Sequence, residues 1–363
     1  MTGQFTTIFI MRFPMVHLSE LAEVVAILDG ITHPSVVDRA LRKADIRREV
    51  LKAEAGFVPY SVEAVVLESV ARSIGERHLG ALVGAAFDYR AYRGYADYVL
   101  GAATLAGALA RGQRALPLLH PGSYVSLVRD GPNVILGFDT GLQSVVGHRH
   151  LDEGAAFVMS VACRHFMGPD WHPEWISVTG DGSSGFSTLE DLTGAPIRGG
   201  AARTALAIRM ADLATPNPNP PAPADIVTLR DLPALMGAQH PKSMEDVVRE
   251  TLRLQFRLGG MSEDSVARRL SLGPRSLQRA LQQEGTSFRE IRARFIQDHA
   301  RALLSDTALS VEAVGRALGY AEPKSFRRAF RGWTGQSPAA YRTAICEAHA
   351  PDPGHRPDAG LAS

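Results

Sequence analysis

The spacing of hydrophobic and polar residues changes along the chain. Over residues 16–115, apolar residues recur at intervals of three and four, which predicts helices. The clearest of these helices are expected at 36–44, 61–75 and 104–116. From residue 123 the interval becomes two, and an Asp-Gly-Pro-Asn turn at 130–133 separates two alternating runs, 124–128 and 134–138. This arrangement predicts a β-hairpin.

The N-terminal domain extends beyond the hairpin. In chain order we expect a third strand at 141–146, a helix at 152–166, a strand at 175–178, a short helix at 188–192 and a last strand at 204–208. A sheet backed by helices, without a regular alternation of strand and helix, is typical of an α+β fold. We therefore predict an α+β domain over residues 16–214.

One pattern occurs twice in the last third of the chain, at 262–281 and at 310–330: a short helix, a glycine-marked turn and a second helix with a polar outer face. The copies are offset by 48 residues before the turn and by 49 after it. The extra residue lies in the turn, so the faces of both helices are preserved. Two helix-turn-helix units in one all-α domain are typical of DNA-binding proteins.

The residues at the helix ends fit this pattern. Each first helix is expected to begin at a serine, whose oxygen accepts a hydrogen bond from a free N–H group. Each second helix is expected to begin at a proline, in a position that needs no N–H group. The pairs are Ser262 and Ser310, Pro274 and Pro323, with Gly273 and Gly319 marking the turns.

The second helix of each copy has two distinct faces. Apolar residues four apart are expected to point inward; they are Leu277 and Leu281, and Phe326 and Phe330. The outer faces carry Arg275, Gln278, Arg279 and Gln282 in the first copy, and Lys324, Arg327, Arg328 and Arg331 in the second. Such side chains hydrogen-bond phosphates and base edges. A merely solvated basic face is the alternative for one copy, but two matched copies favour DNA binding.

A linker helix is predicted between the copies. Residues 287–290 read Ser-Phe-Arg-Glu, a capping box, and apolar residues then follow helical spacing. A helix of about 17 residues rising about 1.5 Å each spans about 25 Å. That length is compatible with two recognition helices in successive major grooves, which repeat about every 34 Å.

Four stretches of the C-terminal region are specific: 277–288, 317–320, 325–335 and 337–342. Through them, residues 243–343 resemble the DNA-binding domain of the AraC/XylS family of bacterial transcription regulators. The resemblance implies DNA contacts from Arg275, Ser276, Gln278 and Arg279 on the first recognition helix, and from Pro323, Lys324, Ser325, Arg327 and Arg328 on the second. It also implies double-stranded promoter DNA and RNA polymerase as partners.

Residues 94–109 and 191–197 carry a second resemblance. They are similar to segments of the effector-binding N-terminal domain in the AraC subgroup that includes ornithine-utilisation regulators. The likeness covers roughly residues 20–215. It implies that this domain binds a small-molecule effector or forms a homodimer, and it assigns no binding residues.

Charge and composition support the division into domains. Residues 241–345 hold 18 Lys and Arg against 11 Asp and Glu, a net charge of +7, whereas the remainder carries −6 of the total of +1. A basic region of this kind is typical of a nucleic-acid-binding domain. Five prolines between 215 and 223 predict an extended, semi-rigid spacer at the start of a linker, 215–242. The tail, 348–363, is expected to be disordered.

Other features argue against secretion and membrane insertion. The two cysteines, Cys163 and Cys346, are far apart, which is typical of a reduced cytoplasm without a disulfide framework. No run approaches the ~20 apolar residues of a membrane span. The apolar segment 6–11 lacks the basic flank and the length of a signal peptide. We expect a cytoplasmic protein, nucleoid-associated when bound to DNA. Residues 1–14 are either a loose extension, or translation starts at Met11 or Met15.

Two motifs suggest enzymes or metal sites, but only weakly. The Gly-x-Gly-x-x-Gly of residues 180–185 follows a predicted strand, yet the acid that a dinucleotide site needs about 20 residues later is missing. We interpret it as a turn. His148 and His150 could begin a metal site with Asp152 and Glu153, but no further ligand has a convincing spacing. We expect no catalytic residues, no metal and no cofactor.

The sequence therefore predicts a sequence-specific transcription regulator, an activator controlled by a small-molecule effector and forming a homodimer. One alternative is a constitutive dimeric regulator whose N-terminal domain binds no ligand. A third possibility, an enzyme with an accessory DNA-binding domain, rests only on the two weak motifs. We expect the first recognition helix to contribute more base discrimination and the second more backbone anchoring, with Arg328 as its main base contact.

Overall fold

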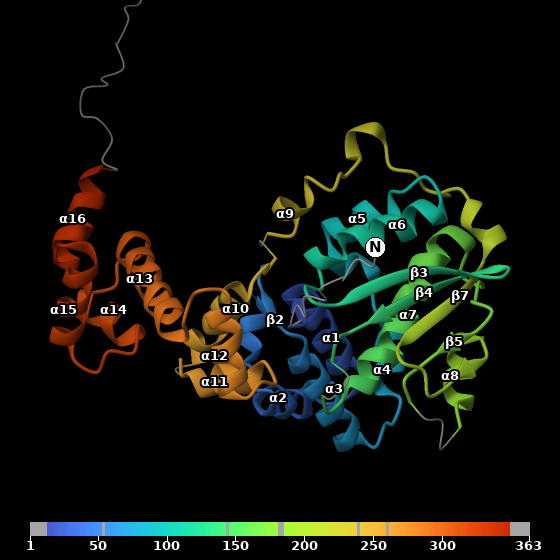
Figure 1. The fold of residues 1–363 in the computed structure, drawn as a ribbon, viewed down its shortest axis with the longest axis horizontal. Coiled ribbons are helices and arrows are strands. Elements are labelled where there is room, and N and C mark those ends of the chain that lie inside the picture. The colour runs from blue at the N-terminus through green and yellow to red at the C-terminus, as the bar shows by residue number, and fades with distance from the viewer. Residues whose placement is uncertain are drawn as a thin grey trace, which may run out of the picture. The chain divides into compact units, whose positions relative to one another are not determined.

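The structure is a computed structural model, and it describes residues 13–52, 55–142, 145–180, 185–237, 240–258 and 261–348. The chain divides into two compact units, one up to Gly285 and one from Thr286. The first unit begins with an α+β domain and continues into helices, and the second unit is helical (Figure 1). The predicted domain boundaries at 214, 242 and 343 stay predictions.

The α+β domain contains a five-stranded sheet. Its strands are β3 (Tyr124–Asp130), β4 (Asn133–Asp139), β5 (Ile176–Ser177), β6 (Ile197–Arg198) and β7 (Thr204–Arg209). They lie in the order β3-β4-β7-β5-β6. Neighbouring strands are antiparallel, except β5 and β6, which are parallel. The predicted hairpin is confirmed, since β3 pairs with β4 from Tyr124 opposite Asp139 to Asp130 opposite Asn133.

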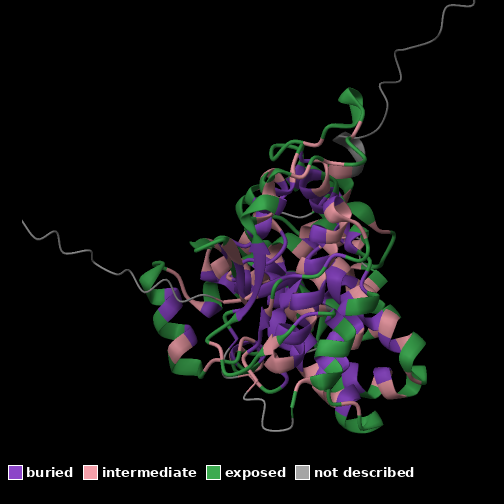
Figure 2. Ribbon diagram, turned by 90° about the vertical axis from the view of Figure 1, so that its right-hand side faces the viewer, coloured by how far each residue is buried: buried purple, intermediate pink, exposed green. Residues whose placement is uncertain are grey.

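Helices and a small second sheet complete this domain. Strands β1 (Met15–His17) and β2 (Phe57–Pro59) pair antiparallel, and each leads directly into a helix. The α-helices are α1 (Leu18–Ile31), α2 (Pro34–Lys43), α3 (Tyr60–Ile74), α4 (Leu79–Ala86), α5 (Gly94–Leu100), α6 (Leu105–Ala115), α7 (His148–Met167) and α8 (Ser187–Thr193). Short 3-10 turns are η1 (Arg48–Lys52), η2 (Tyr89–Tyr92), η3 (Leu116–Leu118) and η4 (Met210–Ala214). Helix α7 packs on β7 and on α4. Figure 2 shows that buried residues gather in the interior, with exposed residues mainly on the outside.

Most predicted elements of this domain are present, and the third strand is the clear error. Described residues between 141 and 146 form turns, and the strand next to β4 is β7. Helix α7 also begins at His148, four residues earlier than predicted. At the N-terminus, Met15 N donates to Pro121 O at 2.8 Å and Tyr60 N donates to Pro14 O at 2.9 Å, so Pro14 and Met15 belong to the fold. Residues 1–12 lie outside the described part.

The proline-rich segment is bound along the α+β domain. Asn217 Nδ2 donates to the carbonyl oxygens of Leu100 and Ala102, at 2.6 and 2.8 Å. Beyond η5 (Pro223–Asp225) and α9 (Leu232–Leu235), Met236 is buried, and its carbonyl accepts a hydrogen bond from His17 Nε2 at 3.1 Å. The linker is therefore not a free spacer, because it is held against the α+β domain at Asn217 and at Met236.

The rest of the chain is helical. The first unit continues with α10 (Met244–Leu258), α11 (Glu263–Arg269) and α12 (Pro274–Gln283). The second unit contains α13 (Phe288–Asp306), α14 (Val311–Ala317), α15 (Pro323–Thr334) and α16 (Pro338–Ala348). The 19-residue α13 confirms the predicted linker helix, and the order α11-α12 and α14-α15 confirms the two helix-turn-helix units. No helix within the described ranges combines the length and the apolar character needed to span a bilayer.

Candidate functional site

The two helix-turn-helix units begin as the sequence predicts. Ser262 Oγ accepts a hydrogen bond from Ser265 N at 3.2 Å, and Ser310 Oγ accepts one from Ala313 N at 3.1 Å. Pro274 and Pro323 are the first residues of α12 and α15. Because the ring presets φ and no N–H group is lost there, these prolines fix where the second helices start.

The turns of the two units differ in a way that the sequence did not indicate. Gly319 has φ +83°, and the residue 48 positions earlier, Ser271, has φ +55°. Gly273 instead caps α12 with an extended backbone, φ −74° and ψ 148°. Gly273 and Gly319 both lie in the turns as predicted, but they hold different places in them, since Ser271 adopts the left-handed conformation in the first helix-turn-helix unit.

The inner faces of the second helices are packed as predicted. Leu277 and Leu281 are fully buried, and so are Phe326 and Phe330, whose ring centroids lie 5.8 Å apart. A Cβ added to Gly315 would lie 3.2 Å from the Phe326 side chain. At the corresponding positions the first helix-turn-helix unit has Ala267 and Leu277, both fully buried, so the glycine and the large ring of the second unit are replaced by a larger and a smaller residue.

The outer face of α12 is open. Arg275, Gln278 and Arg279 are exposed, and Ser276 is half-buried at the start of the helix. Among the described residues, neither arginine forms an ion pair with an acid. The predicted contacts of the first unit thus lie together on one accessible helical face.

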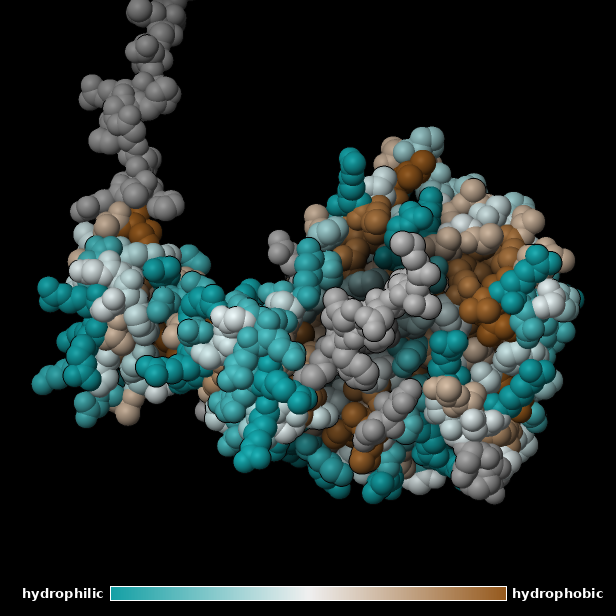
Figure 3. Space-filling model, in the orientation of Figure 1, coloured by the Kyte–Doolittle hydropathy of each residue, from teal (hydrophilic) through white to brown (hydrophobic). Residues whose placement is uncertain are grey.

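The outer face of α15 is also open, with one restriction. Pro323, Lys324 and Arg328 are exposed, and Ser325 is half-buried. Arg327 Nη2 forms an ion pair with Glu312 of α14. Figure 3 shows that the visible surface of this helical unit is largely hydrophilic. Arg327 is therefore already engaged, whereas the Lys324 and Arg328 side chains extend into solvent.

The first helix-turn-helix unit contacts the α+β domain within its compact unit. Arg269 of α11 is 8% exposed, and its guanidinium forms an ion pair with Asp45. The Arg269 carbonyl accepts a hydrogen bond from Ser61 Oγ, in the first turn of α3, at 3.0 Å. Phe57 N–H also hydrogen-bonds the Glu250 carboxylate of α10. Sequence reasoning missed this contact, because Arg269 resembles any other basic residue of the region.

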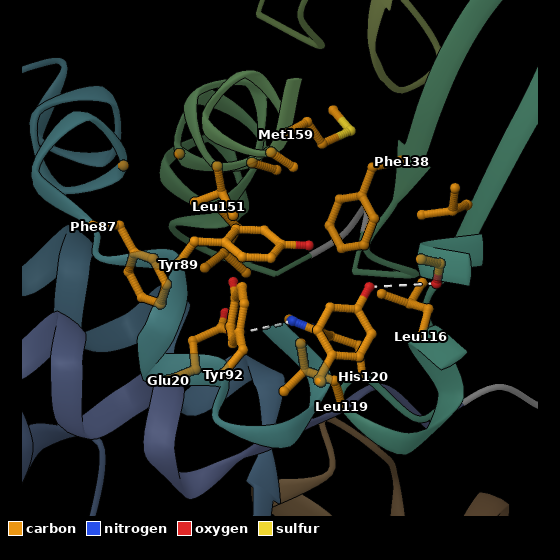
Figure 4. A pocket seen from close by; sticks show the side chains of 18 of the residues that line it. Glu20, Phe87, Tyr89, Tyr92, Leu116, Leu119, His120, Phe138, Leu151 and Met159 are labelled. Carbon is orange, nitrogen blue, oxygen red and sulfur yellow. Dashed lines mark hydrogen bonds and ion pairs between the residues drawn. The ribbon is translucent and has the colours of Figure 1, made fainter. Parts of the chain in front are cut away.

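The α+β domain contains a cavity. Its volume is about 120 Å³, many times the ~10–15 Å³ that a single water molecule needs. The wall comes from α1, α3, α4, η2, α5, α6, β4 and α7. Figure 4 shows the rings of Tyr89, Tyr92 and Phe138 around the open space, with Met159 and Leu151 on another side. A mainly apolar cavity with few polar groups is typical of a small-molecule site.

Polar groups of the cavity come from distant parts of the chain. Glu20 Oε2 lies 2.7 Å from His120 Nε2, and both side chains are 5% exposed. Glu63 is 4% exposed, and burial, then the nearby Glu20, raise the pKa of its carboxyl well above the usual range. One sequence signal points to Glu63. It lies three, four and seven residues before Val66, Leu67 and Val70, on the apolar face of its helix.

The histidines that suggested a metal site have other roles. They lie in the first turn of α7, where His148 Nδ1 donates to Val145 O at 3.0 Å. His150 is fully buried, with Nε2 3.1 Å from Glu68 Oε2 and Nδ1 accepting from Gly80 N. Burial lowers the pKa of His150 to about 4. No cluster of three or more possible metal ligands occurs among the residues that the structure describes. Residues 181–184 of the glycine-rich motif lie outside that part.

Comparison with known proteins agrees with this geometry. Residues 266–344 match the helix-turn-helix domain family, which defines the class of the C-terminal region. Residues 36–217, half of the chain, match the family described as the arabinose-binding domain of AraC transcription regulator, N-terminal. The chain therefore belongs to the AraC family of transcription regulators, which is a family of regulators and not of enzymes.

Individual relatives match over shorter lengths. The regulator VqsM of Pseudomonas aeruginosa is 38% identical over 81 residues, 22% of this chain and 25% of the relative. The ornithine utilization regulator of the same organism is 36% identical over 81 residues, 22% and 24% of the two chains. The match thus spans about a quarter of these curated relatives. The crystal structure of CdpR from Pseudomonas aeruginosa has 21% identity and a TM-score of 0.36, covering 76% of this chain and 91% of its own.

Proposed function

We propose that the protein is a sequence-specific regulator that reads promoter DNA with α12 and α15 and responds to a small-molecule effector. The observation that supports DNA reading best is the pair of matched units, each with exposed basic side chains at the start of its second helix, joined in the first unit by the exposed amide of Gln278. In helix-turn-helix proteins, that end of the recognition helix contacts base edges. Phosphate contacts supply much of the affinity, so binding weakens as salt rises.

The proposed contacts are Arg275, Ser276, Gln278 and Arg279 of α12, and Pro323, Lys324, Ser325, Arg327 and Arg328 of α15. Arg328 is assigned the base contact of the second unit, because it is exposed and has no acid partner within the described residues, whereas Arg327 is paired with Glu312. The denser positive charge of α15 supports backbone anchoring there, and the mixed Arg and Gln face of α12 supports base discrimination.

The cavity of the α+β domain is the proposed effector site. Helix α3 supports a link from this site to DNA, since Tyr60 and Glu63 in its first turn line the cavity and Ser61 donates to Arg269 of α11. A ligand that shifts this turn would act on the first helix-turn-helix unit. The equilibrium moves only as far as the ligand binds the two arrangements differently.

Assembly and location belong to the same proposal. Strand β3 lies at one edge of the sheet, and its Tyr124 and Val128 are 45% and 51% exposed. Exposed apolar residues on an edge strand support pairing with a second copy, and thus a homodimer. Family membership supports action in the cytoplasm, contact with RNA polymerase and activation of transcription.

DNA-binding titrations test the proposal. Genome-wide footprinting with the full chain identifies an operator, and gel-shift titration then measures its affinity. Arg279→Ala and Arg328→Ala should each weaken specific binding by about 1 to 3 kcal/mol, because each removes a base contact. Arg39→Ala, at an exposed site of α2, is the matched loss of charge and should leave affinity unchanged. Wild-type affinity in both recognition-helix variants would contradict the assignment.

A further inference from the structure

The chemistry of the cavity wall limits what the cavity can bind. The wall is dominated by aromatic and aliphatic side chains, so the body of a ligand must be apolar. Two acids, Glu20 and Glu63, line it, but no Lys or Arg does so among the described residues. A carboxylate or phosphate ligand would meet acids without a permanent cation, and burying such a charge unpaired is costly.

The two acids differ in their partners. Glu20 pairs with His120 at 2.7 Å. Glu63 is 4% exposed and lines the cavity, and its Oε2 has no hydrogen-bond partner in the part of the chain that the structure describes. A buried polar atom without a partner costs free energy, which a donor on a ligand would recover. Glu20 Oε2 and His120 Nδ1 also lack a hydrogen-bond partner within the described residues, but Glu20 and His120 have each other as an ion-pair contact. Glu63 is the acid of the wall without such a contact, and it is therefore the one that a donor on a ligand would serve best.

A positive charge suits this position better than a neutral donor. Burial favours the neutral form of the Glu63 carboxyl, and a cation beside it favours the charged form. A charge-assisted hydrogen bond is roughly twice as strong as a neutral one. Tyr60 and Tyr92 line the same cavity as Glu63, and aromatic rings attract cations.

We propose that the effector is an organic amine, with an apolar aromatic or aliphatic body that fills the cavity and a protonated nitrogen that binds Glu63. This inference rests on the proposed effector site, and it adds the chemical class of the ligand. The carboxylate of Glu63 accepts the ammonium hydrogen bonds, and Glu20, in contact with His120, belongs to the same wall.

Calorimetric titration of the full chain tests the ligand class with two sets of three probes. The members of a set share one shape and differ in their polar group. The probes are 2-phenylethylamine, 2-phenylethanol and 3-phenylpropanoate, and hexylamine, hexanol and hexanoate form an aliphatic set. In at least one set the amine should bind about tenfold more tightly than the alcohol, and the carboxylate should not bind.

Variants locate the effect. Glu63→Gln keeps the shape and removes the charge, so it should lower amine affinity about tenfold and change alcohol affinity less than about threefold. Glu49→Gln, at an exposed residue of η1, is the control and should change neither. Met159→Trp fills the cavity and should abolish binding of every probe that enters it.

The outcomes separate the two claims. The proposed amine class is wrong if the amine binds no more tightly than the alcohol of the same set. It is also wrong if Glu63→Gln leaves the amine affinity unchanged. If an alcohol or carboxylate binds and Met159→Trp abolishes its binding, the effector site stands and only the ligand class is wrong. Failure of all six probes in the wild-type chain overturns the amine proposal, and operator titration then decides DNA binding separately.

Discussion

Ser271 adopts a backbone conformation that its side chain disfavours. Its φ is +55°, and Gly319 holds the equivalent place in the second unit at φ +83°. A Cβ at Gly319 would meet nothing within 4 Å, so backbone preference alone decides the cost there. We expect Ser271→Gly to raise the free energy of unfolding by about 0.5 kcal/mol, because the relief of the backbone is partly offset by the greater entropy of glycine in the unfolded chain. Gly319→Ser should lower the free energy of unfolding by about 1 kcal/mol.

Urea unfolding of both variants measures this pair of effects. Ser271→Ala is the control, because it removes the hydroxyl without relieving the backbone, and it should bring no gain. Shifts of the same sign in Ser271→Gly and Gly319→Ser would contradict the equivalence of the two positions.

At the residue scale, local rules were enough for the recognition helices. Once Leu277 and Leu281 are placed inside, helical spacing alone puts Arg275 and Arg279 outside. The same reasoning fails for Arg269, because its burial depends on Asp45 and Ser61, more than 200 residues away in the chain. Glu63 had a local signal, an acid on an apolar helical face, but its partners could not be predicted.

At the scale of elements, α4 approaches α7 more closely than side chains would allow. A Cβ at Gly84 would lie 2.6 Å from Gly154 O, and one at Gly80 would lie 2.0 Å from His150 O. Backbone atoms of two packed helices cannot move aside easily, so Gly84→Ala should lower the free energy of unfolding by about 2 kcal/mol. Since both glycines also line the cavity, the probes described above should bind less tightly.

Thermal unfolding of the full chain measures that effect. Gly30→Ala, in α1, is the matched substitution, because nothing lies within 4 Å of its Cβ. It should stabilise the protein by up to about 1 kcal/mol, as alanine does in a helix. Equal effects of the two substitutions would show that the helices can separate without cost.

The predictability of each element follows from where its contacts lie. The β3–β4 hairpin was predicted because both strands and the turn are contiguous. Helix α4 was missed, since residues 79–86 have almost no polar side chain and therefore no periodicity. The strand predicted at 141–146 was wrong because β7 takes the place beside β4. Strand β7 comes more than 60 residues after β4, so local spacing could not indicate that pairing.

For the whole molecule, the two helix-turn-helix units are alike in fold but differ in what they contact. Arg269 is buried against Asp45 in the first unit, whereas the equivalent residue of the second is Ala317, which is exposed. The first helix-turn-helix unit is thus held by the α+β domain, which contains the cavity. This asymmetry cannot be inferred from the repeat itself, whose two copies match in their serine caps, their prolines and the spacing of their inner apolar residues.

Hydrogen exchange of the full chain tests whether this contact stabilises α11. Removing the buried Arg269 side chain and its ion pair with the exposed Asp45 in Arg269→Ala should cost about 1 to 2 kcal/mol of local stability, and so speed the exchange of α11 amides about 5- to 30-fold. The amides of α14 are an internal control, because Ala317, at the position equivalent to Arg269, has no charged group that could form an ion pair. Arg268→Ala, the exposed neighbour, should change neither helix. Equal acceleration in α11 and α14 would mean that Arg269 acts on overall stability, and the link from the cavity to the first unit would lose its support.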